Sequence, residues 1–228
     1  MPPQNASSAL FSAVQFGHGR GEARCDEAAG LCDIQSMADA AREQMRMSLE
    51  EWGALDEDVA GELVDGVLVE EEDVGALHET IAGHLVFLLR SWLGTRGRVL
   101  TSDAKFAVSE ARGRKPDVTV YFEKTKLPAR RAVSVPPDIA IEIVSPTPRD
   151  RRRDRFEKLV EYARFGIRQY WLIDPEPRTF EVLVRQADAT YAIALVASEG
   201  RLAVPGCEGL VVDLDAMWAE IADFDDAE

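Results

Sequence analysis

Two carboxylates stand in segments of this chain that otherwise have the pattern of buried strands. Glu142 interrupts the alternating run from 138 to 144, in which the isoleucines share the opposite face. Asp117 directly precedes a second apolar run, from 118 to 122. A carboxylate on a strand built for burial is costly unless a positive charge lies against it. The two acids therefore point to a shared charged site rather than to ordinary core strands.

A metal ion would relieve the repulsion between two such carboxylates. Lys158, on a helix-like segment farther along the chain, would add a positive charge nearby. Two acids and a lysine around a divalent cation suit phosphodiester hydrolysis, because the cation activates a water and neutralises charge on the phosphate. Oxygen ligands favour Mg²⁺ or Mn²⁺ over zinc. We expect the cation on Asp117 and Glu142, with the Ile143 carbonyl oxygen as a further candidate ligand and Lys158 polarising the water.

Simpler structural roles remain open for the same residues. Asp117 could be an acid in the turn after Pro116, and Glu142 could pair with a buried arginine. Lys158 could pair with Asp154, four residues before it, which would stabilise a helix slightly. Under this alternative the charges would hold the fold together and perform no chemistry.

A run of arginines follows the Glu142 strand in a chain whose formal net charge is −15. That charge counts against a nucleic-acid partner, which usually meets a basic surface. The acid is spread unevenly, however, with one cluster at 70–73 and another in the tail from 223 to 228. We expect the arginine run to hold phosphate beside the site, and the alternative is a solvated helix start. The run consists of Arg149, Arg151, Arg152, Arg153 and Arg155.

Apolar periodicity and turn residues predict strands interleaved with helices, which indicates an α/β fold with a mixed β-sheet flanked by helices. A hairpin is expected over 62–69, because Asp65-Gly66 favours a tight turn. The other predicted strands cover 98–108, 118–122, 138–144, 169–174, 179–185 and 190–196, and the predicted helices cover 37–52, 78–92, 150–165 and 214–221. The expected inward residues are Ile81, Leu85, Leu88 and Trp92 in the second helix and Phe156, Leu159, Val160 and Ala163 in the third.

The size of the chain, 228 residues, suits one domain with an added arm. Its apolar runs are shorter than the roughly 18 residues that a membrane helix requires. The N-terminus lacks a basic region followed by an apolar stretch, so we expect no secretory signal and no membrane partner. The three cysteines give no paired disulfide framework. We expect a cytoplasmic protein.

Many of these residues stand in the order typical of a known family. The ordered set resembles the Uma-two family of predicted bacterial endonucleases, within the restriction-endonuclease-like, PD-(D/E)XK superfamily. The resemblance rests on the segments Glu62–Gly66, Arg114–Asp117, Ile141–Pro146, Asp154–Lys158 and Tyr170–Pro175, with His78, Tyr162 and Gly166. It implies a restriction-endonuclease-like nuclease domain over 47–221. An N-terminal extension, 1–46, mobile or weakly helical, and an acidic tail, 222–228, would lie outside it.

The resemblance also implies which residues form the site. Asp117 and Glu142 would hold the divalent metal, and Glu62 matches a family acid that adds a ligand directly or through water. For Glu62 a pair with a surface arginine is the alternative. The superfamily often places its lysine two residues after the strand glutamate, where this chain has Val144. The family instead carries the lysine on the following helix, where Lys158 fits.

His78 and Asp154 are accessory candidates beside these residues. His78 stands at a predicted helix start, so helix capping or packing is the alternative to contact with metal or substrate.

The activity that the resemblance implies is metal-dependent hydrolysis of DNA phosphodiester bonds by an endonuclease acting as a homodimer. Two alternatives stay open. The chain could be a catalytically silent binding or regulatory module on a nuclease fold, which its acidic surface favours. It could also cleave RNA or branched DNA rather than duplex DNA.

Overall fold

The computed structural model describes residues 46–56, 59, 61–69 and 75–224. The predictions for the N-terminal extension, for the acidic cluster at 70–73 and for the last four residues of the tail lie outside this part. Residues 46–52 of the first predicted helix are described, and the helix found there, α2, covers Leu49–Ala54. Its N-cap is Ser48, whose hydroxyl accepts from the Glu51 N–H while the Glu51 carboxylate accepts from the Ser48 N–H.

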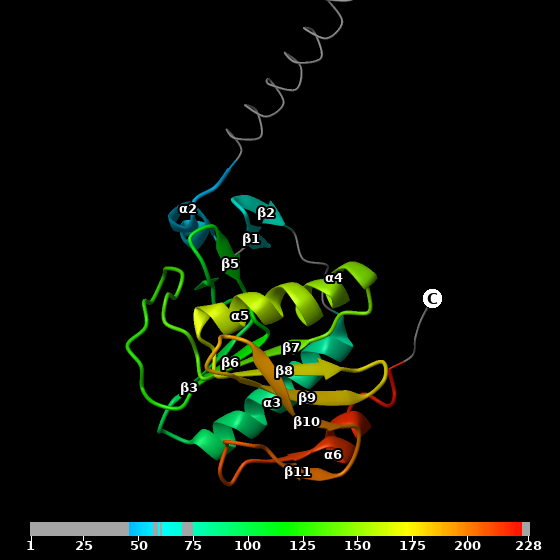
Figure 1. Ribbon diagram of the computed structural model, residues 1–228. Helices are drawn as coiled ribbons and strands as arrows, with labels where there is room; N and C mark the ends of the chain where they lie inside the picture. The colour runs from blue at the N-terminus through cyan, green and yellow to red at the C-terminus, as the bar shows by residue number, and fades with distance from the viewer. Residues whose placement is uncertain (1–45, 57–58, 60, 70–74, 225–228) are drawn as a thin grey trace, which may run out of the picture. The chain divides into compact units, whose positions relative to one another are not determined.

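A six-stranded mixed sheet forms the centre of the fold (Figure 1). Its strand order is β10-β9-β8-β7-β6-β3, and neighbours are antiparallel except for the parallel pair β7 and β8. The strands are β3 (Arg98–Thr101), β6 (Val118–Tyr121), β7 (Ile139–Ile143), β8 (Gln169–Asp174), β9 (Thr179–Arg185) and β10 (Tyr191–Ala197). A parallel pair requires a crossover connection, and here the helical segment from 148 to 165 supplies it. The predicted mixed sheet is confirmed.

A smaller sheet carries Glu62 and adjoins the main sheet through the β5–β6 connection. Its strand order is β2-β1-β5-β4. The predicted hairpin is confirmed, because Asp65 and Gly66 both have positive φ, 51° and 82°, as a tight turn of this type requires. The strands are β1 (Glu62–Val64), β2 (Val67–Val69), β4 (Phe106–Ala107) and β5 (Arg112–Arg114). Near the C-terminus, β11 (Arg201–Ala203) pairs with β12 (Val211–Asp213), and α6 (Leu214–Ala219) follows.

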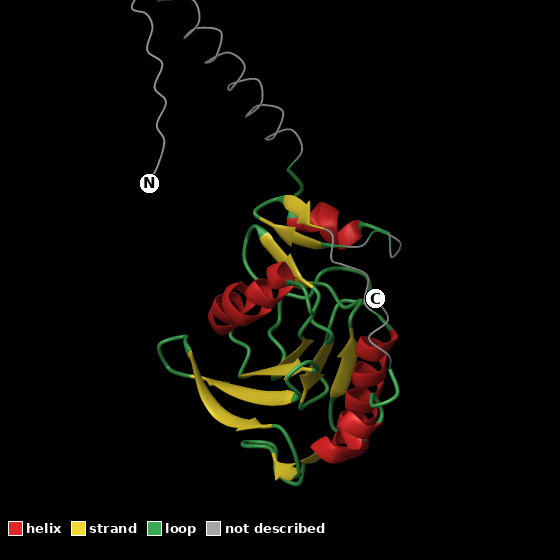
Figure 2. Ribbon diagram, turned by 90° about the vertical axis from the view of Figure 1, so that its right-hand side faces the viewer, coloured by secondary structure: helices red, strands yellow, loops and turns green. Residues whose placement is uncertain are grey.

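Helices cover both faces of the central sheet, as Figure 2 shows from the side. On one face α3 (Ala76–Leu93) packs against the isoleucines of β7 and the inward residues of β6, β8 and β9. The buried stripe of α3 follows four-residue steps through Ile81, Leu85, Leu89 and Leu93. The prediction of Leu88 and Trp92 as core residues was therefore off by one position in the last two turns, and both are partly buried at the edge of this core.

The crossover segment covers the other face and departs from its predicted orientation. It consists of α4 (Pro148–Arg152), the π-helix η1 (Arg153–Lys158) and α5 (Leu159–Phe165), and Gly166 caps it with a positive φ of 107°. Phe156 and Val160, expected inside, are 68% and 43% exposed. The wider π turn changes which side chains face the sheet. Charged and tyrosine side chains are buried there instead, among them Asp154, Lys158 and Tyr162.

Candidate active site

Strand register places Asp117 and Glu142 opposite each other. The antiparallel pair β6 and β7 aligns Val118 with Ile141, so the residue before Val118 faces the residue after Ile141. Such cross-strand neighbours have Cβ atoms about 4.5–5.5 Å apart and share one face of the sheet. The Asp117 Oδ2 also accepts a hydrogen bond from the Ile143 N–H at 2.7 Å. The structure thus brings together the two acids that the sequence singled out.

The Glu142 carboxylate is buried and both of its oxygens have partners. The Tyr162 hydroxyl donates to Oε1 at 2.6 Å, and the Lys158 ammonium donates to Oε2 at 2.9 Å. Burial raises the pKa of Glu142 well above its ordinary value, and the charge of Asp117 adds to the rise, although the Lys158 charge opposes it. The buried arginine considered for Glu142 is absent from its contacts in the described chain, and Lys158 takes that place.

Within the described part of the chain, Lys158 lies among three carboxylates. Its Nζ is 2.9 Å from Glu142, 3.2 Å from Asp154 and 3.4 Å from Glu62. Burial alone would lower the pKa of this lysine, but the charges of Glu142, Glu62 and Asp154 raise it well above its ordinary value. The pair with Asp154, expected as an alternative to catalysis, is present together with the contact to Glu142. Lys158 is therefore a cation at the centre of the cluster.

Glu62 is fully buried, so its predicted alternative as a surface ion pair was wrong. Its carboxylate accepts from Arg114 Nη1 at 2.6 Å and from the Lys115 N–H at 3.0 Å. Burial would raise the pKa of Glu62, but the Lys158 and Arg114 charges outweigh it and lower the pKa. Arg114 in turn donates to Glu161 on α5. The small sheet is thereby tied to the crossover helix through buried charge.

His78 contacts the site rather than capping its helix. It lies in the first turn of α3, and Gly75 is the N-cap. The His78 Nε2 is 3.1 Å from the Asp117 Oδ2, while Nδ1 is buried without a hydrogen-bond partner in the described part of the chain. Burial opposes protonation, but the bond to Asp117 and its charge raise the pKa of His78. His78 thus helps to orient Asp117.

The arginine run divides between two sides of the crossover segment. Arg151 and Arg155, one helical turn apart, both reach Asp174 at the end of β8, at 3.3 Å and 3.0 Å. Arg155 also donates to Glu181 on β9 at 2.8 Å. These two guanidinium groups are held by acids of the same chain, so intrachain pairing competes with any phosphate for them.

The remaining three arginines differ in exposure. Arg153 is buried, pairs with Asp150 and lies 3.7 Å from Glu62. Arg149 and Arg152 are exposed on the outside of α4. These two are the exposed members of the run, and Arg149 also lies 3.7 Å from Asp150.

The donor set fits a magnesium-type cation held by few protein ligands. No group of three or more histidine, cysteine or acidic side chains arranged for a metal occurs among the described residues. Mg²⁺, however, commonly uses one or two carboxylates and completes its shell with waters and substrate phosphate. Asp117 and Glu142 supply such a pair, and the raised pKa values of Glu142 and Asp154, caused first by burial and then by neighbouring acids, mark a place where added positive charge is favourable.

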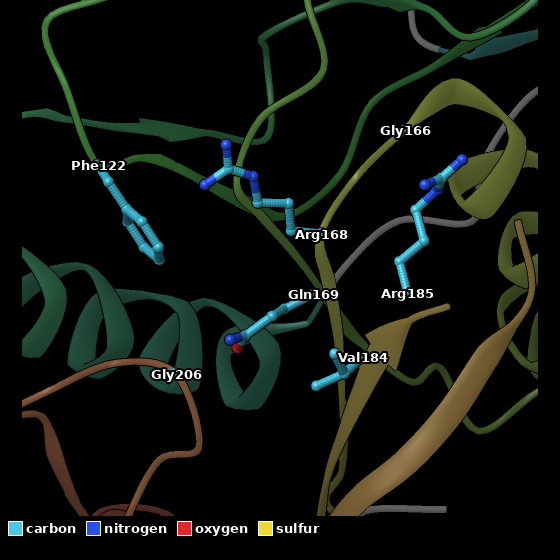
Figure 3. A pocket seen from close by; sticks show the side chains of 7 residues that line it. All are labelled: Phe122, Gly166, Arg168, Gln169, Val184, Arg185 and Gly206. Carbon is cyan, nitrogen blue, oxygen red and sulfur yellow. The ribbon is translucent and has the colours of Figure 1, made fainter. Parts of the chain in front are cut away.

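A separate cavity lies at the other end of the strands. It has a volume of about 450 Å³ and is lined by Phe122, Arg168, Gln169 and Val184 among others (Figure 3). Gln169 begins β8 and pairs in register with Ile139 at the start of β7, three residues before Glu142. The cavity contains none of the predicted site residues.

Comparison with known proteins agrees with this fold. The Uma2 family model, described as "Putative restriction endonuclease", matches residues 47–215. The chain belongs to the Uma2 family. A solved structure titled as a putative nuclease belonging to DUF820 from Anabaena variabilis ATCC 29413 is similar, with 20% sequence identity and a TM-score of 0.60. The match covers 77% of this chain and 99% of that one. A search among curated proteins finds no match.

The Uma2 match and this fold likeness confirm the predicted family and fold. No helix in the described ranges is long and apolar enough to cross a membrane.

Two side chains of the cluster were assigned no role from the sequence. Tyr162 stands four residues after Lys158, and a helix places such residues on one face. Arg114 stands three residues before Asp117, in the segment that carried the resemblance. Both residues belong to the set on which the resemblance rests. Their roles could not be predicted because the sequence does not show which distant side chain each one contacts in the fold.

Proposed function

We propose that this Uma2 protein is a Mg²⁺- or Mn²⁺-dependent endonuclease that hydrolyses phosphodiester bonds of DNA. Asp117 and Glu142 would hold the cation at its active site. One observation carries the proposal. Two acids on adjacent strands share a face with a buried lysine 2.9 Å from one of them. A core that needed only packing would place apolar side chains at these positions.

The chain's own residues have separable tasks in this mechanism. Asp117 is oriented by His78 and by the Ile143 N–H, and Glu142 is oriented by the Tyr162 hydroxyl. The bound cation would activate a water and neutralise charge on the phosphate. Lys158 would polarise the attacking water or stabilise negative charge as it develops on the phosphate oxygens. Glu62 and Asp154 would hold Lys158, and Glu62 is also a candidate for a water-mediated metal contact.

The proposed substrate is DNA, held in part by the arginine run. Arg149 and Arg152 are the exposed members, and their charge adds an attraction that salt weakens. A homodimer would let two sites act on two strands, and a two-fold contact is the commonest way to form one.

A catalytically silent binding module is the second candidate, and one observation favours it. Lys158 already neutralises part of the acidic cluster without any metal. A nuclease acting on RNA or branched DNA is a variant of the first candidate.

Cleavage assays with a matched control separate these candidates. Purified protein is incubated with plasmid, single-stranded DNA, branched DNA and RNA, with and without Mn²⁺. Asp138 is the matched acid, because it too accepts a backbone N–H across the strand pair, from Phe122 at 2.8 Å. We expect Mn²⁺-dependent cleavage of DNA that Asp117→Asn abolishes and Asp138→Asn retains. Full Mn²⁺-dependent cleavage by the Asp117→Asn variant would refute the assignment of the site.

A further inference from the structure

The position of Lys158 has a feature that the proposed catalysis does not require. Among the residues that the structure describes, its ammonium contacts carboxylates from three different elements, Glu142 on β7, Asp154 on η1 and Glu62 on β1. A lysine that only polarised a water would need one such anchor and an open side. Here the lysine side chain is 3% exposed, and its ammonium lies where the acids of the cluster converge. This is the environment of a bound cation.

The π-helix explains how the lysine reaches this position. η1 runs from Arg153 to Lys158 and buries both Asp154 and Lys158 toward the sheet. π-Helical turns in proteins often occur at functional sites. The Tyr162 hydroxyl takes the Glu142 Oε1, so the lysine takes Oε2, and each oxygen of this carboxylate is engaged.

We propose that the Lys158 ammonium stands in for the divalent cation in the metal-free protein, and that cation binding moves it from Glu142 onto Asp154 and Glu62. The proposal rests on the proposed function, since it requires a cation at Asp117 and Glu142. A dication and an ammonium on one carboxylate repel each other, so their joint binding to Glu142 is disfavoured. The two remaining acids are already 3.2 Å and 3.4 Å from Nζ, so a small side-chain movement suffices.

This exchange gives Asp154 a role, as the acid that retains the lysine near the phosphate after the cation enters. It also predicts that the protein binds its cation more weakly than its carboxylates alone would. The lysine would thereby keep the buried acids paired while no metal is bound, which limits the cost of their burial.

Calorimetry with Mn²⁺ tests the exchange through a pair of variants. Lys158→Met removes the competitor, and Arg153→Met removes the same charge from the same π-helix, where Arg153 contacts Asp150 and Glu62. We expect Lys158→Met to bind Mn²⁺ about tenfold more tightly than the wild type or more, a change of about 1.4 kcal/mol. Arg153→Met should stay within a few-fold of the wild type. Equal affinities for Lys158→Met and Arg153→Met would overturn the exchange and leave only a general effect of charge.

A measurement on the wild type covers the case in which Lys158→Met does not fold. The nitrogen resonance of the buried ammonium is followed by NMR while Mg²⁺ is added. Loss of the Glu142 acceptor should speed hydrogen exchange of the ammonium severalfold. Unchanged exchange in protein that takes up Mg²⁺ would contradict the proposed movement of the lysine.

The outcomes also separate this inference from the proposed function. If wild type and Lys158→Met bind Mn²⁺ equally and Asp117→Asn abolishes binding, the exchange is wrong and the metal site stands. If neither the wild type nor Lys158→Met binds Mn²⁺, both are wrong.

Discussion

The two ends of the β6–β7 strand pair use the same local device in different surroundings. At one end Asp117 accepts the Ile143 N–H, and at the other Asp138 accepts the Phe122 N–H. Asp117 lies beside buried charges, whereas Asp138 pairs with Arg168, whose side chain is 73% exposed. An acid that completes the hydrogen bonding of a strand end is therefore no evidence of chemistry by itself. The buried acids and lysine around Asp117 distinguish this end of the strand pair, which carries the candidate active site and is called the active end.

The difference between the two ends should have its largest effect on the free energy of unfolding, when one arginine is replaced at each end. Arg114 is fully buried at the active end and pairs with Glu62, whereas Arg168 pairs with Asp138 at the surface. Arg114→Met should lower the free energy of unfolding by about 3–5 kcal/mol, because it removes one partner of a buried pair. Arg168→Met should change it by less than about 1 kcal/mol.

Denaturant unfolding of both variants measures this difference. Similar small losses of stability for the two would mean that the charges at the active end are not effectively buried.

Glu142 should make stability depend on pH with a definite sign. Its folded-state pKa is raised above the ordinary 4.5, first by burial and then by neighbouring acids, so the folded chain binds the proton more tightly than the unfolded chain. The resulting stabilisation is complete below about pH 4.5 and is lost as pH rises through the folded-state pKa of Glu142. The wild type should therefore become less stable relative to Glu142→Gln as pH rises.

Thermal or denaturant melts of both proteins in a chelator across a pH series give this difference. At neutral pH we expect Glu142→Gln to be as stable as the wild type or more so. A difference that grows in favour of the wild type with rising pH would indicate that the bond to Lys158 dominates instead.

Salt dependence of DNA binding should show a smaller effect, confined to the active end. Changing Arg149 and Arg152 to Ala should weaken binding and reduce the slope of log affinity against log salt by about 1 for each phosphate that the variant no longer neutralises. Arg168→Ala removes an exposed charge at the other end and should leave the slope unchanged. Equal slopes for all of these proteins, from binding titrations at several salt concentrations, would show that the run is a solvated helix start.

Much of this fold could be predicted because its signals are local. The alternation around Glu142, the Asp65-Gly66 turn and the glycine that ends α5 each determine their own element. The acids of the site were also predictable, since a carboxylate within an apolar strand is conspicuous in the sequence alone.

The inward face of the crossover helix could not be predicted from its sequence. Regular 3.6-residue periodicity points Phe156 and Val160 inward, but the π-helix changes the register and acids from other strands hold Lys158. Hydrophobic periodicity assigns a lysine to the exposed face of a helix, so it cannot predict a buried lysine whose partners lie on distant strands. The pairing of Glu62 with Arg114 was missed for the same reason, since 52 positions separate the two residues in the chain.

Calorimetric titration with Mn²⁺ tests the central claim most directly. It measures whether the protein binds a cation through Asp117 and Glu142 and whether Asp138, at the other end of the strand pair, contributes to that binding. The account predicts binding by the wild type and by Asp138→Asn, and loss of binding in Asp117→Asn combined with Glu142→Gln. Equal heats for the wild type and that double variant would contradict it.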